Sequence, residues 1–145
     1  MKVLIDTRVV IDFLQKREPF ANAAWKLFRT IATEQLAGYI TAKETTDIYY
    51  LMHRFTHSDQ ESRHLLNQLL SLISILDTSS EDIFHALSSA ISDFEDAVMT
   101  ETAIRSKMDC IITRNKKDYA KAEIPIYDPI EFWNLLKNDD VNDIY

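Results

Sequence analysis

The chain has 145 residues, 46% of them hydrophobic and 27% charged, which is typical of one soluble globular domain with a buried core. Its single glycine excludes the glycine-rich loops that bind phosphates and dinucleotides. One cysteine excludes an internal disulfide, and no apolar run is long enough to span a membrane. We therefore expect a cytoplasmic protein.

The net charge of −7 argues against a nucleic-acid partner when it is considered alone, because such proteins usually carry a basic surface. A site made of carboxylates and divalent cations changes this conclusion, because bound ions become the largest local charges. Part of the acidic surplus can therefore belong to such a site.

Short apolar runs alternate with helical patterns along the chain. The runs that predict strands are residues 2–5, 37–40, 73–76, 110–112 and 125–127. Ser or Thr followed three residues later by Glu predicts helix starts at Thr41, Ser58, Thr78 and Ser92. The alternation is typical of an α/β fold with three α/β/α layers, in which a five-stranded parallel sheet carries helices on both faces.

A single domain over residues 1–137 accounts for all these elements, and residues 138–145 are expected to form a loose acidic tail. Amphipathic patterns place Trp25, in a helix over 21–34, and Phe55, in the helix that begins at Thr41, on the apolar faces of those helices.

Aspartates follow the ends of several predicted strands. Asp6 ends the first strand, Asp47 lies in the second turn of the helix after the second strand, and Asp118 follows the fourth. Asp93 and Asp96 open the helix that leads into the fourth strand and share one helical face. Because ligands bind at the carboxyl ends of parallel strands, these acids are expected to meet at one edge of the sheet.

Several carboxylates in one place repel each other unless a cation lies between them. Oxygen ligands without His or Cys suit Mg²⁺ or Mn²⁺ better than zinc. Such ions polarise a phosphodiester and lower the pKa of an attacking water. The acidic cluster therefore indicates metal-dependent phosphodiester hydrolysis.

Two segments, DFEDA at 93–97 and ITRNKKDY at 112–119, resemble the second half of a PIN domain. The opening IDT at 5–7 and the segment 41–50 resemble its first two acidic motifs. The resemblance covers nearly the whole chain, and it depends on the order and intervals of motifs that are individually weak.

The PIN resemblance implies the strand order 3-2-1-4-5 and a metal-dependent ribonuclease, often the toxin of a toxin–antitoxin pair. The RNA it cuts would be single-stranded or structured, and the partners implied are an antitoxin protein and a second copy of the chain. The residues that match the family's catalytic and metal-binding acids are Asp6, Asp47, Asp96 and Asp118. Asp93 matches an additional metal-site acid, and the matching supporting residues are Thr7, Thr113 and Asn115.

Arg8 departs from the family pattern, which usually has a small polar residue at this position. Its guanidinium could pair with a carboxylate and compete with the metal, or hold a phosphate. Inhibition by Arg8 gives the alternative hypothesis of a catalytically weakened module that binds RNA or a protein partner. Arg114 and Lys116, which flank Asn115, are the other candidates for phosphate contacts.

Simpler interpretations compete with these assignments. Asp93 and Asp96, taken singly, are typical helix-capping residues. Glu44 and Glu95 fit capping boxes, so we assign them to helix starts and leave them out of the site. A phosphatase that acts on small phosphate esters is a further alternative, which the absence of a nucleophile motif and of glycine-rich loops disfavours.

Overall fold

The computed structural model describes the backbone of residues 1–144 and the side chains of residues 1–139. Its centre is one sheet, in which the strands lie side by side in the order β3-β2-β1-β4-β5 and every neighbouring pair is parallel. The strands are β1 (Lys2–Ile5), β2 (Ala37–Thr41), β3 (Ser74–Leu76), β4 (Cys110–Ile112) and β5 (Ile126–Tyr127). Both the predicted parallel sheet and the predicted strand order are confirmed.

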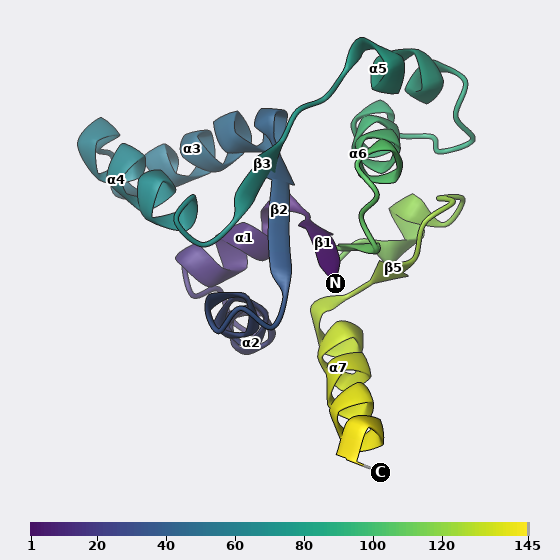
Figure 1. The fold of residues 1–145 in the computed structure, drawn as a ribbon. Coiled ribbons are helices and arrows are strands. Elements are labelled where there is room, and N and C mark those ends of the chain that lie inside the picture. The colour runs from purple at the N-terminus through teal and green to yellow at the C-terminus, as the bar shows by residue number, and fades with distance from the viewer. Residues whose placement is uncertain (145) are drawn as a thin grey trace.

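Helices cover both faces of this sheet, which gives the predicted three layers (Figure 1). The helices are α1 (Thr7–Leu14), α2 (Ala21–Ala32), α3 (Ala42–Thr56), α4 (Asp59–Leu69), α5 (Ser80–Leu87), α6 (Phe94–Arg105), the 3₁₀ helix η1 (Lys116–Tyr119) and α7 (Pro129–Ile144). Among the described residues, no helix has both the length and the apolar character needed to cross a membrane.

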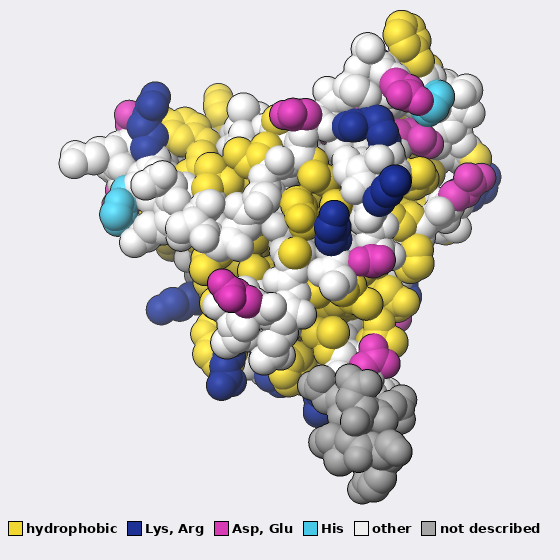
Figure 2. Space-filling view, in the orientation of Figure 1, with side chains coloured by type: hydrophobic (Ala, Val, Ile, Leu, Met, Phe, Trp, Pro, Cys, Tyr) yellow, Lys and Arg dark blue, Asp and Glu magenta, His cyan; other side chains and the backbone are white. Residues whose placement is uncertain are grey.

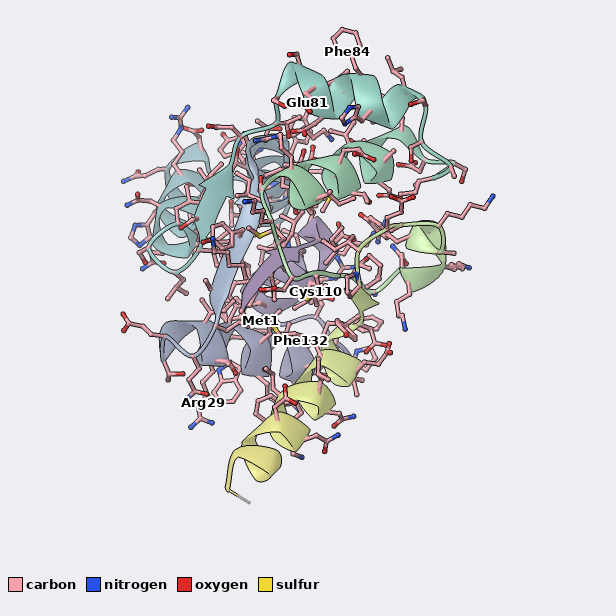
Figure 3. All side chains as sticks on the ribbon, turned by 45° about the vertical axis from the view of Figure 1, so that its right-hand side comes forward. Met1, Arg29, Glu81, Phe84, Cys110 and Phe132 are labelled. Carbon is pink, nitrogen blue, oxygen red and sulfur yellow. The ribbon has the colours of Figure 1, made fainter. Side chains whose placement is uncertain are left out.

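The alternation of side chains along the central strands separates two cores. Val3 and Ile5 of β1 enter a large core shared with α1, α2, α3 and α7, whereas Leu4 enters a smaller core beneath α6. Cys110 of β4 and Phe132 of α7 both belong to the larger core (Figure 3). The strands are therefore buried on both faces, as expected for a parallel sheet.

Two helix starts lie one residue later than the sequence predicted. Ser79 rather than Thr78 caps α5, and Asp93 rather than Ser92 caps α6. The predicted caps at Thr41 and Ser58 are confirmed by hydrogen bonds from the backbone amides of Glu44 and Glu61. Ser, Thr and Asp cap helices about equally well, so sequence alone did not choose between adjacent candidates.

The predictions for two aromatic residues were wrong. Trp25 is 49% exposed and lies beneath the guanidinium of Arg29, and Phe55 is 61% exposed near the end of α3. The backbone of residues 138–144 belongs to α7, and Tyr145 lies outside the described residues, so the loose tail over 138–145 stays a prediction. Helical periodicity defines a face, but it does not show how far the neighbouring element extends along it.

A buried ion pair joins α1 to the turn after β4. The Asp12 side chain is 1% exposed, and its Oδ2 lies 2.8 Å from Nε of Arg114. Arg114 also lies over the ring of Phe20, 3.7 Å from its centroid. Burial raises the pKa of Asp12, and the charges of Arg114 and Arg17 oppose that rise. The pair holds the turn after β4 against α1.

Asp12→Ala is expected to lower the free energy of unfolding by about 3 kcal/mol, because it leaves the Arg114 charge largely buried without its partner. Chemical denaturation measures the change. Asp59→Ala is the matched control, since it removes an exposed pair with Arg63 on α4 and should cost less than about 1 kcal/mol. Equal losses in the two variants would contradict the assigned role of Asp12.

Candidate active site

Asp6 is held at the carboxyl edge of the sheet by hydrogen bonds to the end of β4 and to the start of α1. Its amide donates to the carbonyl of Ile112 at 2.9 Å, which continues the pairing of β1 with β4. Its Oδ2 accepts a hydrogen bond from the Thr113 hydroxyl at 2.7 Å, and its Oδ1 accepts one from the Thr7 amide at 2.8 Å. Burial raises the pKa of Asp6, and these hydrogen bonds oppose the rise.

Glu44 brings a second carboxylate to the same place from the first turn of α3. Its Oε1 accepts from the Thr41 amide at 2.9 Å, which completes the capping box, and its Oε2 accepts from the Thr7 hydroxyl at 3.2 Å. Thr7 therefore contacts both Asp6 and Glu44. Burial, and then the charge of Asp6, raise the pKa of Glu44 well above its usual range.

Asp96 supplies a third carboxylate from the first turn of α6. Its Oδ1 accepts a hydrogen bond from the Tyr119 hydroxyl at 3.0 Å, and its amide donates to Oδ1 of Asp93 at 3.0 Å. Burial raises the pKa of Asp96 to about 6; the Tyr119 hydrogen bond opposes the rise, while the charges of Asp93, Asp6 and Asp118 add to it. The charges of neighbouring acids thus raise the pKa values of Glu44 and Asp96, and the acids involved at this edge are Asp6, Glu44, Asp93, Asp96 and Asp118.

A cleft of about 670 Å³ opens over these acids between α1, α3 and α6. Asp6, Glu44 and Asp96 line it, and so do Thr7 and Asn115. Asn115 is placed by the turn after β4, where its amide donates to the Thr113 hydroxyl at 3.1 Å. The supporting residues predicted from the sequence therefore lie at the acidic edge.

The remaining predicted acids have different positions. Asp47 lines the cleft, but it is 41% exposed and its Oδ2 lies 2.7 Å from Nζ of Lys43. Asp93 caps α6 through the amide of Asp96 and is exposed. Asp118 is exposed in η1 and acts on Asp96 through its charge. The simple capping interpretation therefore holds for Asp93, whose charge also reaches the site.

Glu44 is the residue that sequence reasoning left out. Its fit to a capping box is correct, yet the same carboxylate also faces Asp6 across Thr7. A signal was present in the sequence, because the first turn of a helix that directly follows a strand lies at the carboxyl edge of the sheet. A capping role and a site role are compatible, because the carboxylate has two oxygens.

The predicted phosphate contacts are largely engaged elsewhere. Arg114 pairs with buried Asp12, and Nζ of Lys116 lies 2.8 Å from Oε2 of Glu131. Arg8 does line the cleft, where its charge lowers the pKa of Asp6. Within the described part of the chain, Arg8 forms no ion pair within 4 Å with a carboxylate, so the pairing suggested by the sequence is not seen.

The chemistry of the donors fits a hard divalent cation. Burial raises the pKa values of Asp6, Glu44 and Asp96, and repulsion by neighbouring carboxylates adds to the rise for Glu44 and Asp96. A cation would relieve both effects. In the described residues, no three His, Cys, Asp or Glu side chains already have the arrangement of a metal site. The cluster thus supplies suitable oxygen donors without a preformed coordination sphere.

The fold and this acidic edge can now be compared with known proteins. The model of the PIN domain matches residues 2–117 of the chain. The chain belongs to the PIN-domain family. No curated protein is significantly similar to it in sequence.

Solved structures of PIN-like proteins share this fold. A toxin–antitoxin complex from Klebsiella pneumoniae contains a chain with a TM-score of 0.64 and 23% identity, covering 88% of this chain and 97% of that one. A chain of VapBC2 from Rickettsia felis, bound to a DNA fragment from its promoter, has a TM-score of 0.63 and 16% identity. The match covers 88% of this chain and 98% of that one. VapC20 from Mycobacterium tuberculosis, a toxin that cleaves the sarcin–ricin loop, has a TM-score of 0.58 and 10% identity. The match covers 75% of this chain and 86% of that one. At these identities the likeness concerns the fold.

The pKa of Asp96 yields a prediction about stability without metal. The folded chain keeps a proton on Asp96 up to about pH 6, whereas the unfolded chain loses it near 3.8. The folded state therefore binds more protons between these values, and the free energy of unfolding should fall as pH rises through them. Asp96→Asn should flatten this slope in denaturation experiments with EDTA.

Two further variants test the assignment to Asp96. Tyr119→Phe removes the hydrogen bond that lowers the pKa of Asp96, so the fall in stability should extend to higher pH. Asp47→Asn changes an exposed residue of the cleft, so the free energy of unfolding should depend on pH in this variant as it does in the unmodified protein. A slope that Asp96→Asn does not change would show that Asp96 is not the group responsible.

Proposed function

We propose that this protein is a Mg²⁺- or Mn²⁺-dependent ribonuclease that hydrolyses RNA phosphodiester bonds. The observation that carries the proposal is the convergence of Asp6, Glu44 and Asp96, buried or half-buried, at the carboxyl edge of a PIN fold. A structural neighbour that cleaves the sarcin–ricin loop supports RNA as the substrate. A phosphatase for small esters has no comparable support.

In this proposal Asp6, Glu44 and Asp96 hold the metal ion, and Asp118 and Asp93 complete its environment. The bound ion would supply polarisation of the phosphodiester and a more acidic attacking water. Thr7 and Thr113 keep the carboxylate of Asp6 directed at the cleft through their hydrogen bonds. Asp47 is the weaker candidate for the second acid, because its charge is already matched by Lys43.

We also propose that the protein acts as the toxin of a toxin–antitoxin pair, with an antitoxin and a second copy of itself as partners, in the cytoplasm. The support is the similarity to a chain of a toxin–antitoxin complex and to VapBC2, which was solved on a promoter fragment. A gene for a small DNA-binding protein beside this one is the simplest independent check.

Cleavage of a mixed single-stranded RNA should require Mn²⁺ or Mg²⁺, stop with EDTA and disappear in Asp96→Asn. Glu44→Gln should lower the rate about 100-fold or more, by analogy with the losses caused by disturbing a metal site. This substitution removes the charge, while glutamine can still complete a capping box. Asp47→Asn should stay within a few-fold of the intact protein. The reverse order of effects would assign the second acid to Asp47.

Arg8 supports a second candidate function, a weakened module that binds RNA or a protein partner without efficient cleavage. The observation in its favour is a cation that lines the cleft and acts on Asp6. Such a charge opposes a metal ion at the same acid. Under this alternative, the intact protein would bind RNA and cleave it poorly.

Under this alternative, Arg8→Asn should tighten Mn²⁺ binding several-fold in calorimetry and raise the rate of RNA cleavage, because it removes a competing positive charge. Arg63→Asn is the control, since Arg63 is exposed on α4 and pairs with Asp59. Unchanged Mn²⁺ affinity and unchanged cleavage in Arg8→Asn would contradict an inhibitory role for Arg8.

A further inference from the structure

The cleft over the acids also carries exposed aromatic side chains. Tyr50 of α3 is 71% exposed and Phe94 of α6 is 48% exposed, and both line the cleft. Arg8 and Arg17 line the same cleft. Aromatic rings beside cations are the combination that proteins use to bind single-stranded nucleic acid, because rings stack on bases while cations meet phosphates.

The two rings come from opposite walls of the cleft. On α3, Lys43, Asp47 and Tyr50 are spaced i, i+4 and i+7, so they share the helix face that lines the cleft. Tyr50 lies about 10 Å along α3 from Lys43, and thus away from the helix end that carries Glu44. Phe94 is the first residue of α6, two positions before Asp96. Along the chain, Phe94 therefore precedes Asp96 and Tyr50 follows Glu44, on two different helices that both line the cleft.

We propose that Tyr50 and Phe94 stack on unpaired bases on either side of the scissile phosphate, which makes them the positioning residues that select single-stranded RNA. This inference rests on the proposed ribonuclease function. In a duplex the bases are stacked on each other, so their faces are closed to a protein ring, whereas the bases of loops and ends can be splayed out. Leu51, Val98 and Met99 also line the cleft and give it apolar surface that suits bases.

The charges in the cleft favour RNA over an apolar peptide as the occupant. In the described chain Arg8 has no ion-pair partner, and Nε of Arg17 is 3.9 Å from Oδ1 of Asp12. A peptide without acidic groups would remove these cations from water with no compensation, whereas RNA phosphates would pair with them. On the face in Figure 2, a few Lys and Arg side chains lie close together in the upper centre, and hydrophobic and acidic side chains surround them.

The chain offers matched controls for both rings. Phe55 lies on α3 like Tyr50, is 61% exposed and is not among the residues that line the cleft. Phe84 lies on α5, is 68% exposed and is also not in the lining. Figure 3 shows the Phe84 side chain pointing outward from the molecule. Replacing either control ring removes similar exposed aromatic surface without changing the cleft.

The experiment measures binding of the intact protein, in EDTA, to a labelled single-stranded RNA and to the same sequence in a duplex. Tyr50→Leu and Phe94→Leu should each weaken single-strand binding about 10-fold, the usual effect of losing one stacked base. Tyr50→Phe should retain binding, and Phe55→Leu and Phe84→Leu should stay within about twofold. With Mn²⁺ present, the two cleft variants should raise KM more than they lower kcat.

The outcomes separate this inference from the proposed function. Binding without cleavage by the intact protein would contradict the ribonuclease function. The stacking role of Tyr50 and Phe94 would still hold if only the cleft variants bound more weakly. Cleavage with equal binding by cleft and control variants would overturn the stacking role alone. Equal affinity of the intact protein for duplex and single strand would overturn it as well. A change of oligomeric state in Tyr50→Leu or Phe94→Leu, with RNA binding intact, would assign the rings to a protein interface instead.

Discussion

The placement of Asp6 between two adjacent parallel strands is the constraint on which the rest of the site depends. Its amide continues the ladder from β1 to β4, and its carboxylate accepts hydrogen bonds from residues of both segments. Burial disfavours its charge, so the neighbouring hydroxyl and amide groups must hold it in place. Glu44 shares Thr7 with Asp6 as a hydrogen-bond donor, and the charge of Asp6 raises the pKa values of Glu44 and Asp96.

The electrostatics of the edge connect stability with function. Burial raises the pKa values of Asp6, Glu44 and Asp96, and repulsion adds to the rise for Glu44 and Asp96. The acid cluster is therefore a cost to the folded chain at neutral pH. A divalent cation would offset that cost and supply the chemistry of phosphodiester hydrolysis. The buried pair of Asp12 and Arg114 holds the turn after β4, which carries Asn115, against α1.

Under the proposed function, the same arrangement would account for RNA recognition by an acidic protein. The net charge of −7 would repel a polyanion at long range. Attraction of RNA would therefore act only at short range. It would come from the cations and aromatic rings that line the cleft and from metal ions held by the acids. We infer that recognition depends more on the local fit of unpaired nucleotides than on a broad basic surface.

The parallel α/β fold, the strand positions and a group of acids at one edge could all be predicted from the sequence, because strand ends and helix starts are local patterns. Which carboxylates come into contact depends on tertiary packing. Glu44 and Asp47 lie within one turn of each other, yet Glu44 faces Asp6 while Asp47 pairs with Lys43 at the surface. Likewise, Arg114 has a buried partner 102 residues away in the sequence. Such contacts depend on how helices are rotated and packed against the sheet, which periodicity alone does not specify.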